Sequence, residues 1–415
     1  MNVAVFHPGT QHSWQTATAV QQLGRLQFYA TSIFYKPEEW PYRIERYLPG
    51  RLRQRVHDEF RRFEHPALDP ELVKSAGLFE WLERIAARAG LEKTAVRLDL
   101  AGNRRFARFL EREIRSDREF ALWGYNSSAL ESFELARDLG RFCILDRTNG
   151  DFRVYNRIME EILGEYGDYF LPGHRRIPDW TIERDDREYA EADRIVVGSE
   201  FARATLAQGC PDPAVAKKTR VLNYCFDESL YADLPKPAPV PPGEPVRFLF
   251  LGQLIPRKGI HHVLEAIEQI PASQARLTLV GKMGVPKEAF ARFADRVDFI
   301  PTVARADVPR IMSEHHVFLL PTYFEGAGIV LYEALASGMA LIQSRNAALA
   351  ATPDTGIMLE EIDTGSLLGA MMALVDDRNR LDHFRAHAQA EAQNYTFARY
   401  RSNIAKVLAE AGLGG

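Results

Sequence analysis

Two glutamates, Glu325 and Glu333, lie eight positions apart in an otherwise mostly apolar stretch, residues 321–338. An ionised carboxylate in apolar surroundings is costly unless a donor hydrogen-bonds to it, and a sugar ring or a ribose would supply such hydroxyls. Gly326 and Gly328 stand between the two acids, where a turn would expose backbone N–H groups at a positive helix end. Such a turn suits a phosphate or another anion. The stretch therefore predicts a site for a ligand that carries both hydroxyls and negative charge.

Two cations, Arg257 and Lys258, form the second set of residues that could do chemistry. They follow the apolar segment 246–251 and precede Gly259. Arginine offers a planar fork and lysine a point charge, which is a suitable pair for a diphosphate. An Arg-Lys pair before a helix is often only a solvated loop, and a strand, a glycine turn and an apolar helix occur in many α/β proteins. Each motif alone therefore also has a purely structural interpretation.

The elements that must position these residues are strands followed by helices. A buried-strand pattern at 317–320 leads into the glycine turn and a helix expected over 329–336, with Gly338 after its last turn as a stop. The loop with the two cations leads into a helix expected over 261–268. Open α/β sheets bind their ligands at the carboxyl ends of their strands, so both motifs are expected to take part in ligand binding.

Together, the two motifs resemble the retaining nucleotide-sugar glycosyltransferases of family 4. The likeness is carried by the glycine and the Lys-Gly pair within 252–259, and by the two acids separated by seven residues. A third stretch, residues 188–201, is similar to that family's strand-to-serine segment late in the first domain. The likeness extends from about residue 185 to the end of the chain. It implies the α/β GT-B fold, in which two Rossmann-like, doubly wound parallel-sheet domains face a central cleft.

The resemblance also implies roles for individual residues. Lys258 and Arg257 would neutralise the departing diphosphate, helped by the helix end at 328–330, and Glu333 would accept hydrogen bonds from the donor ribose. Glu325 and nearby backbone amides would hold the sugar hydroxyls. The residues expected to contact the donor are Gly252, Gln253, Gly326, Ala327, Gly328, Ile329, Val330 and Glu333. The residues expected to act in catalysis are Lys258, Arg257, Glu325 and Asp151.

Two positions depart from the family's pattern. Many relatives carry arginine at the place of Gln253, so Arg257 would have to carry more of the phosphate charge here. The turn after the strand expected at 142–145 is where many relatives contact the donor sugar with a histidine, and here Asp151 or Asn149 takes that place. The departures leave two other functions open: a catalytically silent scaffold that binds nucleotide-sugars, and a GT-B epimerase or phosphorylase.

The favoured prediction is a retaining glycosyltransferase of the hexosyltransferase type, active in glycan or polysaccharide biosynthesis. It would transfer a sugar from a nucleoside diphosphate-sugar to a hydroxyl acceptor, which could be a glycan, a lipid-linked glycan or a small molecule. No D-x-D motif is present to hold a metal diphosphate, so we expect metal independence and no cofactor. The adjacent pairs His261-His262 and His315-His316 do not share a helix face as metal ligands would, and we expect them to be packing or surface residues.

The first strand, expected over 2–6, leads into a loop that faces the ligand crevice of a doubly wound domain. Gly9 would let a substrate approach closely there, while Thr10 and His12 offer polar contacts from the same loop. His12 is equally well explained as a helix-start or surface residue. No G-x-G-x-x-G follows a strand, which argues against a nicotinamide dehydrogenase.

Length and composition set the broad frame. The chain has 415 residues with 46% apolar content, which is ample for two domains. The expected domains are 1–228, with a helix at 397–415 packing back on it, and 229–396, joined by the stiff proline-rich linker 236–245. The formal charge of −4 gives no global attraction to nucleic acid. Three cysteines and the lack of a leader or span-length apolar segment favour a cytoplasmic protein, dissolved or peripherally attached to the membrane.

An arginine-rich segment, residues 43–62, is unusual for the family. Its seven arginines are Arg43, Arg46, Arg51, Arg53, Arg55, Arg61 and Arg62. Basic pieces of this kind can lie on an anionic membrane surface or hold an anionic acceptor. A solvated arginine-rich face is the other interpretation. The segment therefore predicts a peripheral membrane contact and a part in shaping the acceptor side.

Overall fold

The structure is a computed structural model that describes residues 1–9, 12–61, 63–75 and 105–414. The chain divides into two compact units. The first unit comprises Met1–Arg147, Glu183–Val196 and Arg401–Gly415, and the second comprises Thr148–Ile182 and Val197–Tyr400. Among the described residues, no helix has both the length and the apolar character that crossing a membrane requires.

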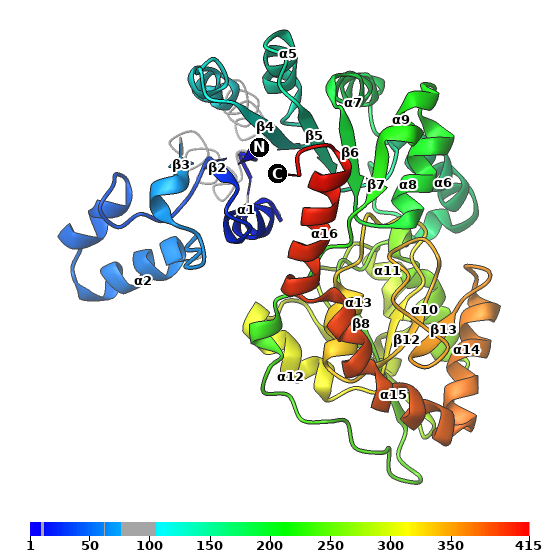
Figure 1. The fold of residues 1–415 in the computed structure, drawn as a ribbon. Coiled ribbons are helices and arrows are strands. Elements are labelled where there is room, and N and C mark those ends of the chain that lie inside the picture. The colour runs from blue at the N-terminus through cyan, green and yellow to red at the C-terminus, as the bar shows by residue number, and fades with distance from the viewer. Residues whose placement is uncertain (10–11, 62, 76–104, 415) are drawn as a thin grey trace. The chain divides into compact units, whose positions relative to one another are not determined.

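The first sheet has the strand order β3-β2-β1-β4-β5-β6-β7 (Figure 1). Its strands are β1 (Asn2–Phe6), β2 (Leu26–Thr31), β3 (Val73–Ser75), β4 (Phe120–Tyr125), β5 (Cys143–Arg147), β6 (Arg194–Val197) and β7 (Thr219–Val221). Strand β1 pairs in parallel with both β2 and β4, and β4 pairs in parallel with β5. Every residue of β4 and β5 is buried, because helices cover both faces of a parallel sheet.

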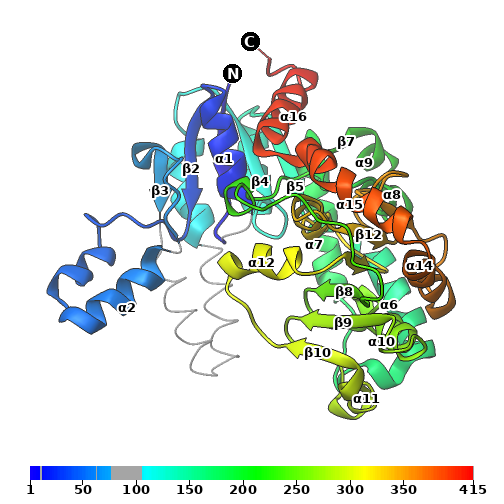
Figure 2. The same cartoon turned by 90° about the horizontal axis from the view of Figure 1, so that it is seen from below.

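The helices that accompany the first sheet are α1 (Ser13–Gln22), α2 (Gly50–Arg61), a helix over 105–114, α5 (Leu130–Asp138), α7 (Asp179–Glu191) and α16 (Phe397–Glu410). Helix α2 lies outside the β3 edge of the sheet in both views (Figure 1, Figure 2). The end of the chain is tied to the first unit, where the Arg25 guanidinium donates to the Leu413 carbonyl at 2.7 Å.

The second sheet is parallel, with the strand order β10-β9-β8-β11-β12-β13. Its strands are β8 (Val246–Leu251), β9 (Ala275–Val280), β10 (Val297–Ile300), β11 (Val317–Leu320), β12 (Ala340–Gln343) and β13 (Gly356–Met358). Figure 2 shows β8, β9 and β10 running side by side. From β8 the chain proceeds outward to β10, and it then returns to β11, which pairs with β8 and starts the other half. The order therefore reverses between β8 and β11.

Side chains along the central strands of the second sheet point alternately to its two faces, so each face carries its own apolar core. Phe248 and Phe250 belong to one apolar cluster, whereas Leu249, between them, belongs to the other. The first face is covered by α10 (Ile260–Glu268) and α14 (Thr364–Asp376), and the second by α12 (Val308–Ser313) and α13 (Val330–Ala336). Helix α15 (Arg378–Ala392) contributes to both clusters, and α11 (Lys287–Ala291) follows β9. Helices on both faces make this a doubly wound sheet.

Three further helices belong to the second unit: α6 (Phe152–Tyr166), α8 (Glu200–Gly209) and α9 (Pro213–Lys218). The expected domain bounds, 1–228 and 229–396, remain a prediction, and the compact units differ from them. Residues 148–182 and 197–228 fall in the same unit as the second sheet.

The strands expected at 2–6 and 317–320 are confirmed as β1 and β11, with the same bounds. Strands β2, β3, β7 and β13 were not predicted from the sequence. Strands β3, β7 and β13 have three residues each, which is too short to show an alternating or continuous apolar pattern.

Candidate functional site

The candidate site lies where the strand order of the second sheet reverses. Strands β8 and β11 are direct neighbours there, with Val317 opposite Phe248. The loop that follows β8 carries Arg257 and Lys258, and the loop that follows β11 carries Glu325. Ligands of open α/β sheets bind outside the carboxyl ends of the strands at such a reversal. The topology therefore brings the two sequence motifs to the place where this architecture binds ligands.

The two loops are tied to each other through their backbones. The loop after β8 forms the short helical turn η5 (Pro256–Lys258). The Arg257 carbonyl accepts hydrogen bonds from the Tyr323 backbone N–H at 2.9 Å and from the Thr322 hydroxyl at 3.3 Å. These bonds hold both cations beside the loop that carries Glu325.

Arg257, Lys258 and Glu325 form a partly buried charge cluster, called the cation clamp below. The Lys258 Nζ lies 3.0 Å from the Glu325 Oε2, and the Arg257 Nη1 lies 3.5 Å from the same oxygen. The Arg257 guanidinium also donates to the Phe324 carbonyl. Burial favours the neutral acid, but the charges and hydrogen bonds of Lys258 and Arg257 outweigh it and lower the pKa of Glu325. The clamp thus presents two cations and one ionised carboxylate, with a net charge of +1.

Gly252 and Gln253 lead into the clamp from β8. A Cβ atom at Gly252 would lie 3.5 Å from the Lys258 Nζ, so the missing side chain leaves room next to the ammonium. Gln253 is exposed. Both residues therefore lie close to the cations, and their contacts with a donor stay a prediction.

The glycine turn after Glu325 is held by segments that precede the second sheet in the chain. A Cβ atom at Gly326 would lie 1.9 Å from the Thr148 carbonyl oxygen, so only glycine fits there without a shift. The buried Ser199 hydroxyl donates to the Gly326 carbonyl at 2.6 Å. Ser199 ends the strand-to-serine segment, and this bond is a physical reason for a hydroxyl at that position. Gly328 adopts a φ of 79°, the left-handed region that glycine enters without strain.

The turn leaves backbone donors available at the start of α13. In the described part of the chain, the N–H groups of Gly328, Ile329 and Val330 have no acceptor. All three residues are partly exposed, whereas Ala327 is buried and its carbonyl accepts from the Ala348 N–H at 2.8 Å. Free N–H groups at a partly exposed helix start can receive an anion.

Glu333 lies on α13, one and a half turns beyond the glycine turn, and is only partly exposed. Its carboxylate has no hydrogen-bond donor among the residues that the structure describes. Burial raises the pKa of Glu333, an effect that the positive charge of Arg305 opposes and the negative charge of Asp227 strengthens. An acid in this state is suited to accept hydrogen bonds from ligand hydroxyls.

Asp151 and Asn149, the two residues at the family's histidine position, have different surroundings. Asp151 is 1% exposed and caps α6, where its carboxylate accepts from the backbone N–H groups of Arg153 at 2.8 Å and Val154 at 3.4 Å. Asn149 is exposed, and a Cβ atom at Gly326 would lie 3.3 Å from its Cα atom. The structure thus gives Asp151 a capping role and places Asn149 next to the glycine turn. A donor-sugar contact of Asp151 stays a prediction.

The loop after β1 contains the remaining predicted residues. Gly9 packs against the ring of the buried His7, whose pKa burial lowers to about 4. His12 occupies the N-cap position of α1, and its Nδ1 lies 3.1 Å from the Gln15 Oε1. A ligand contact of Gly9 or His12 stays a prediction, and Thr10 lies outside the described residues.

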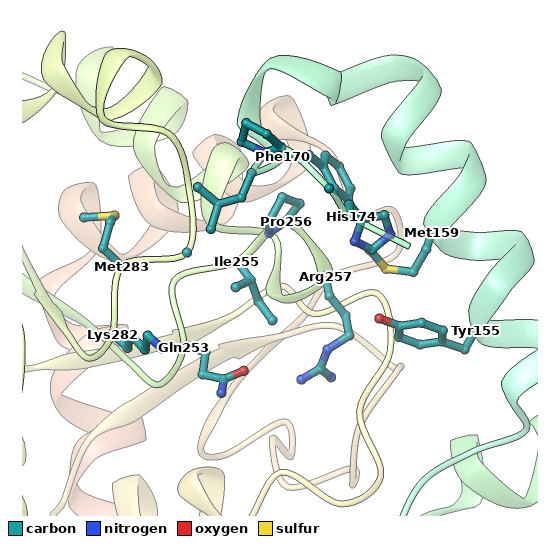
Figure 3. A pocket seen from close by; sticks show the side chains of 14 residues that line it. Tyr155, Met159, Phe170, His174, Gln253, Ile255, Pro256, Arg257, Lys282 and Met283 are labelled. Carbon is teal, nitrogen blue, oxygen red and sulfur yellow. The ribbon is translucent and has the colours of Figure 1, made fainter. Parts of the chain in front are cut away.

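A pocket of about 400 Å³, called the α6 pocket below, adjoins the clamp within the second unit (Figure 3). Helix α6 and the loop after it supply one wall, and the loops after β8 and β9 supply the other. Its lining residues are Tyr155, Met159, Phe170, Leu171, Pro172, Gly173, His174, Gln253, Ile255, Pro256, Arg257, Lys282, Met283 and Gly284. The Tyr155 hydroxyl points toward the Arg257 side chain in Figure 3. A pocket of this size and mixed lining can hold a small molecule.

Only Gln253 and Arg257 of the predicted site residues line the α6 pocket. Lys282 was not identified from the sequence, although it follows β9, the neighbour of β8. The Leu254 backbone N–H donates to the Lys282 carbonyl at 3.0 Å, which holds the two loops together. Its position directly after a parallel strand was the signal that could have found Lys282. The loop 170–174 carries no such signal.

The four paired histidines are packing residues, as predicted. All of them are buried, and the rings of His262 and His315 bond to the hydroxyls of Thr364 at 2.8 Å and Thr278 at 2.7 Å. Within 1–9, 12–61, 63–75 and 105–414, no group of three or more His, Cys, Asp or Glu residues is placed to hold a metal ion. Metal independence stays a prediction.

Residues 245–377, which contain the whole clamp, match the family model described as glycosyl transferases group 1. The chain is 24% identical over 238 residues to D-inositol 3-phosphate glycosyltransferase of Corynebacterium efficiens, covering 54% of this chain and 52% of that protein. It is 30% identical over 158 residues to the GDP-mannose-dependent monoacylated alpha-(1-6)-phosphatidylinositol monomannoside mannosyltransferase of Corynebacterium glutamicum, covering 34% and 41%. The chain thus spans about half or less of the length of these relatives.

Solved structures match over nearly the whole chain. Sucrose-phosphate synthase from Thermosynechococcus elongatus matches with a TM-score of 0.65 at 15% identity, covering 100% of both chains. Anabaena HepE in complex with UDP matches with a TM-score of 0.60 at 14% identity, covering 99% of this chain and 100% of that one. These likenesses confirm the expected fold class, two parallel-sheet α/β domains of the GT-B type.

Proposed function

We propose that the protein is a retaining, metal-independent glycosyltransferase of the hexosyltransferase type. It transfers a sugar from a nucleoside diphosphate-sugar to a hydroxyl acceptor. The observation that carries the proposal is the cation clamp at the strand-order reversal, inside the residues that match the glycosyl transferases group 1 model. Retention of configuration and family 4 membership rest on the acid pattern at 325 and 333.

The clamp supports a role in stabilising the leaving group. Negative charge grows on the diphosphate as the bond from sugar to phosphate breaks, and prepositioned cations stabilise that charge without reorganising. Lys258 is already oriented by Glu325 at 3.0 Å, and Arg257 is oriented by its bond to the Phe324 carbonyl. The free N–H groups of 328–330 supply further donors to the phosphates or to the sugar.

Lys282 is proposed to supply the charge that the glutamine at 253 lacks. Arg257 is already engaged by Glu325 and by the Phe324 carbonyl, which limits its reach. Lys282 is exposed, lines the α6 pocket beside the clamp and has no carboxylate within ion-pair distance in the described part of the chain. A mobile ammonium of this kind can meet a phosphate as a point charge.

Glu333 is proposed to bind the donor ribose. Its carboxylate lacks a donor among the described residues, and burial makes an unpaired ionised acid costly. Two ribose hydroxyls would satisfy it, and the interaction would contribute to donor affinity rather than to bond breaking.

A catalytically silent nucleotide-sugar-binding scaffold remains the second candidate. The observation that favours it is Asp151, which caps α6 and is 1% exposed at the place where many members of the resembled family use a histidine. A GT-B epimerase or phosphorylase would use the same donor groups for another reaction.

The experiment that separates these functions measures free nucleoside diphosphate. Purified protein is incubated with UDP- and GDP-sugars, with and without candidate hydroxyl acceptors, and the sugar product is analysed for its anomeric configuration. Acceptor-dependent release with retention supports the transferase. Binding without release supports the scaffold, and an isomerised nucleotide-sugar or a sugar phosphate product supports the third class.

The names of the relatives, an inositol phosphate glycosyltransferase and a phosphatidylinositol mannoside mannosyltransferase, support a place in glycan or glycolipid synthesis. We also propose a cytoplasmic location with peripheral attachment to anionic membranes. Arg43, Arg51, Arg53 and Arg55 are exposed on the segment predicted to make this contact, while Arg62 lies outside the described residues. Weak binding to anionic vesicles that disappears at high salt is expected in a flotation assay. Unchanged binding after these four arginines are neutralised would refute the membrane contact.

A further inference from the structure

A second cavity, of about 530 Å³, lies in the first unit between the turn η1 (Tyr42–Tyr47) and α2. It is called the Glu45 pocket below, and its lining includes Tyr35, Tyr42, Glu45, Arg46, Arg53 and His57. The segment that enters it continues from the carboxyl end of β2, and the Ser32 N–H bonds there to the Pro8 carbonyl at 3.2 Å. The pocket is therefore built from the end of the first sheet where ligands of α/β domains bind.

An apolar cluster fixes the floor of the pocket. Ile33, Tyr35, Tyr42, Phe60 and Phe63 pack together, with Tyr42 edge-on to Phe60 at 5.0 Å between ring centroids. This cluster anchors η1 and α2 to the residues after β2. The polar side chains that line the pocket are therefore held in place by a packed apolar cluster.

Glu45 is a buried acid with one oxygen left unpaired. The residue is 7% exposed, and its Oε2 accepts from the Tyr35 hydroxyl at 3.1 Å and lies 3.0 Å from the His57 Nδ1. Its Oε1 is fully buried and has no partner within the described ranges. A buried acceptor without a donor is unfavourable, and a ligand hydroxyl entering the pocket would satisfy it.

Two arginines, Arg46 and Arg53, also line this pocket. Arg46 pairs with Glu38, whereas Arg53 has no carboxylate within ion-pair distance in the part of the chain that the structure describes. A guanidinium fork matches the geometry of a phosphate. The pocket therefore offers a hydroxyl acceptor and a phosphate fork within one cavity.

We propose that the Glu45 pocket binds a phosphorylated polyol. The phosphate contacts Arg53 and Arg46, a ring hydroxyl donates to the Glu45 Oε1, and the rings of Tyr35 and Tyr42 lie against the apolar face of the ligand. The ligand is either a free sugar or polyol phosphate, or the headgroup of an inositol phospholipid. Its identification as the acceptor rests on the proposed function, whereas the binding itself does not.

Calorimetry on the full chain tests the proposal with myo-inositol 1-phosphate and glucose 1-phosphate as probes. Myo-inositol and inorganic phosphate are measured as separate probes, because each corresponds to one half of the proposed ligand. We expect saturable binding of at least one polyol phosphate, at least tenfold tighter than either half. Arg53→Gln should weaken that binding at least tenfold, and Glu45→Gln should abolish the preference for the polyol phosphate over inorganic phosphate. Arg112→Gln, an exposed arginine of the helix over 105–114 that lies outside the arginine-rich segment and does not line the pocket, should stay within twofold of the wild type.

Vesicles distinguish the two sources of the ligand. Preference for phosphatidylinositol over phosphatidylglycerol vesicles, lost in Arg53→Gln but kept in Arg112→Gln, assigns the pocket to a lipid headgroup. Saturable binding of the soluble probes alone assigns it to a free polyol phosphate. Equal losses in both arginine variants, or no saturable binding of any probe at millimolar concentration, would overturn the proposal.

UDP and GDP binding is measured on the same samples and is expected to be unchanged in Arg53→Gln. If the protein binds a polyol phosphate but neither nucleotide, the proposal for the Glu45 pocket holds and the proposed function is contradicted. If it binds a nucleotide but no polyol phosphate, the proposed function holds and the proposal for the pocket is contradicted.

Discussion

The cation clamp and the Glu45 pocket both place a glutamate that is at least partly buried near arginine, yet the carboxylate oxygens are paired differently in the two places. In the clamp, two cations converge on one oxygen of Glu325, which stays ionised. In the pocket, Glu45 is held by a tyrosine and a histidine, and its second oxygen has no partner within the described ranges. A carboxylate oxygen that is already paired can orient cations toward a ligand, whereas an unpaired carboxylate oxygen can itself accept a hydrogen bond from a ligand.

The largest expected effect comes from removing the ammonium of the clamp. Lys258→Ala should lower kcat by about ten- to a hundredfold, since a charge-assisted hydrogen bond contributes about 1.5–3 kcal/mol in a dry site. Donor affinity should change less, because the charge on the diphosphate grows in the transition state. Steady-state kinetics on an identified donor measures both constants, with Lys287→Ala on α11 as the control.

Near wild-type kcat in Lys258→Ala would show that the loop after β8 does not stabilise the leaving group. The variants Arg257→Ala and Lys282→Ala, measured in the same assay, show how much each of the other two cations contributes to kcat. A loss in Lys282→Ala larger than that in Arg257→Ala is expected if Lys282 supplies the charge absent at Gln253.

A smaller effect is expected at the other acid of the motif. Glu333→Gln should weaken donor binding by about three- to tenfold, because the amide keeps one acceptor oxygen but loses the charge-assisted bonds to the ribose. The value of kcat at saturating donor should stay close to the wild type. Isothermal titration with the nucleoside diphosphate measures the first quantity, and an equal fall in kcat without a change in affinity would contradict the ribose role.

The two acids of the motif should also respond to pH in opposite ways. Folding raises the pKa of Glu333, so its contribution to stability falls as pH rises from the ordinary glutamate pKa to the raised one. Folding lowers the pKa of Glu325, so its contribution is present above the ordinary pKa and is lost as pH falls through the lowered one. Denaturant unfolding at several pH values should therefore show that the free energy of unfolding of Glu333→Gln rises relative to that of the wild type as pH increases. The free energy of unfolding of Glu325→Gln should fall relative to that of the wild type over the same change. The same trend in both variants would be the contrary result.

The smallest expected effect is none at all. Activity after exhaustive chelation should equal untreated activity, because the clamp supplies fixed cations in place of a divalent ion. Assays in excess EDTA, with a parallel sample restored with magnesium or manganese, check this. Activity that returns only after magnesium or manganese is added would contradict metal independence.

Sequence reasoning located the clamp because its residues lie within a few positions of strongly apolar strands. Arg257, Lys258 and Glu325 each follow a central strand, and the family resemblance supplied the pairing between the two loops. The parallel α/β architecture of the second half could be predicted because strands and helices alternate clearly after residue 246, whereas the doubly wound fold was implied by the family resemblance.

The Glu45 pocket and the wall of the α6 pocket could not be found in this way. Glu45 and His57 come from different elements of an arginine-rich segment, and nothing in their spacing shows that they bond to each other. Phe170 and His174 lie in a loop whose contact with the residues after β8 depends on tertiary packing alone. Asp151 is ambiguous for a related reason: an aspartate before a helix can be a cap or a ligand, and the sequence alone does not reveal its capping bonds.

The second unit is discontinuous, and this limits how the protein can be cut. Thr148–Ile182 enters the unit before β6, and the chain returns to the unit at Val197. A recombinant fragment that begins at residue 229 would lack α6, the Thr148 carbonyl against Gly326 and the Ser199 hydroxyl that bonds to it. Such a fragment would expose to water the side of Gly326 that packs against the Thr148 carbonyl and would leave the Gly326 carbonyl without the Ser199 bond. A fragment of the second unit for crystallisation or isotope labelling therefore needs residues 148–182 fused to 197–400.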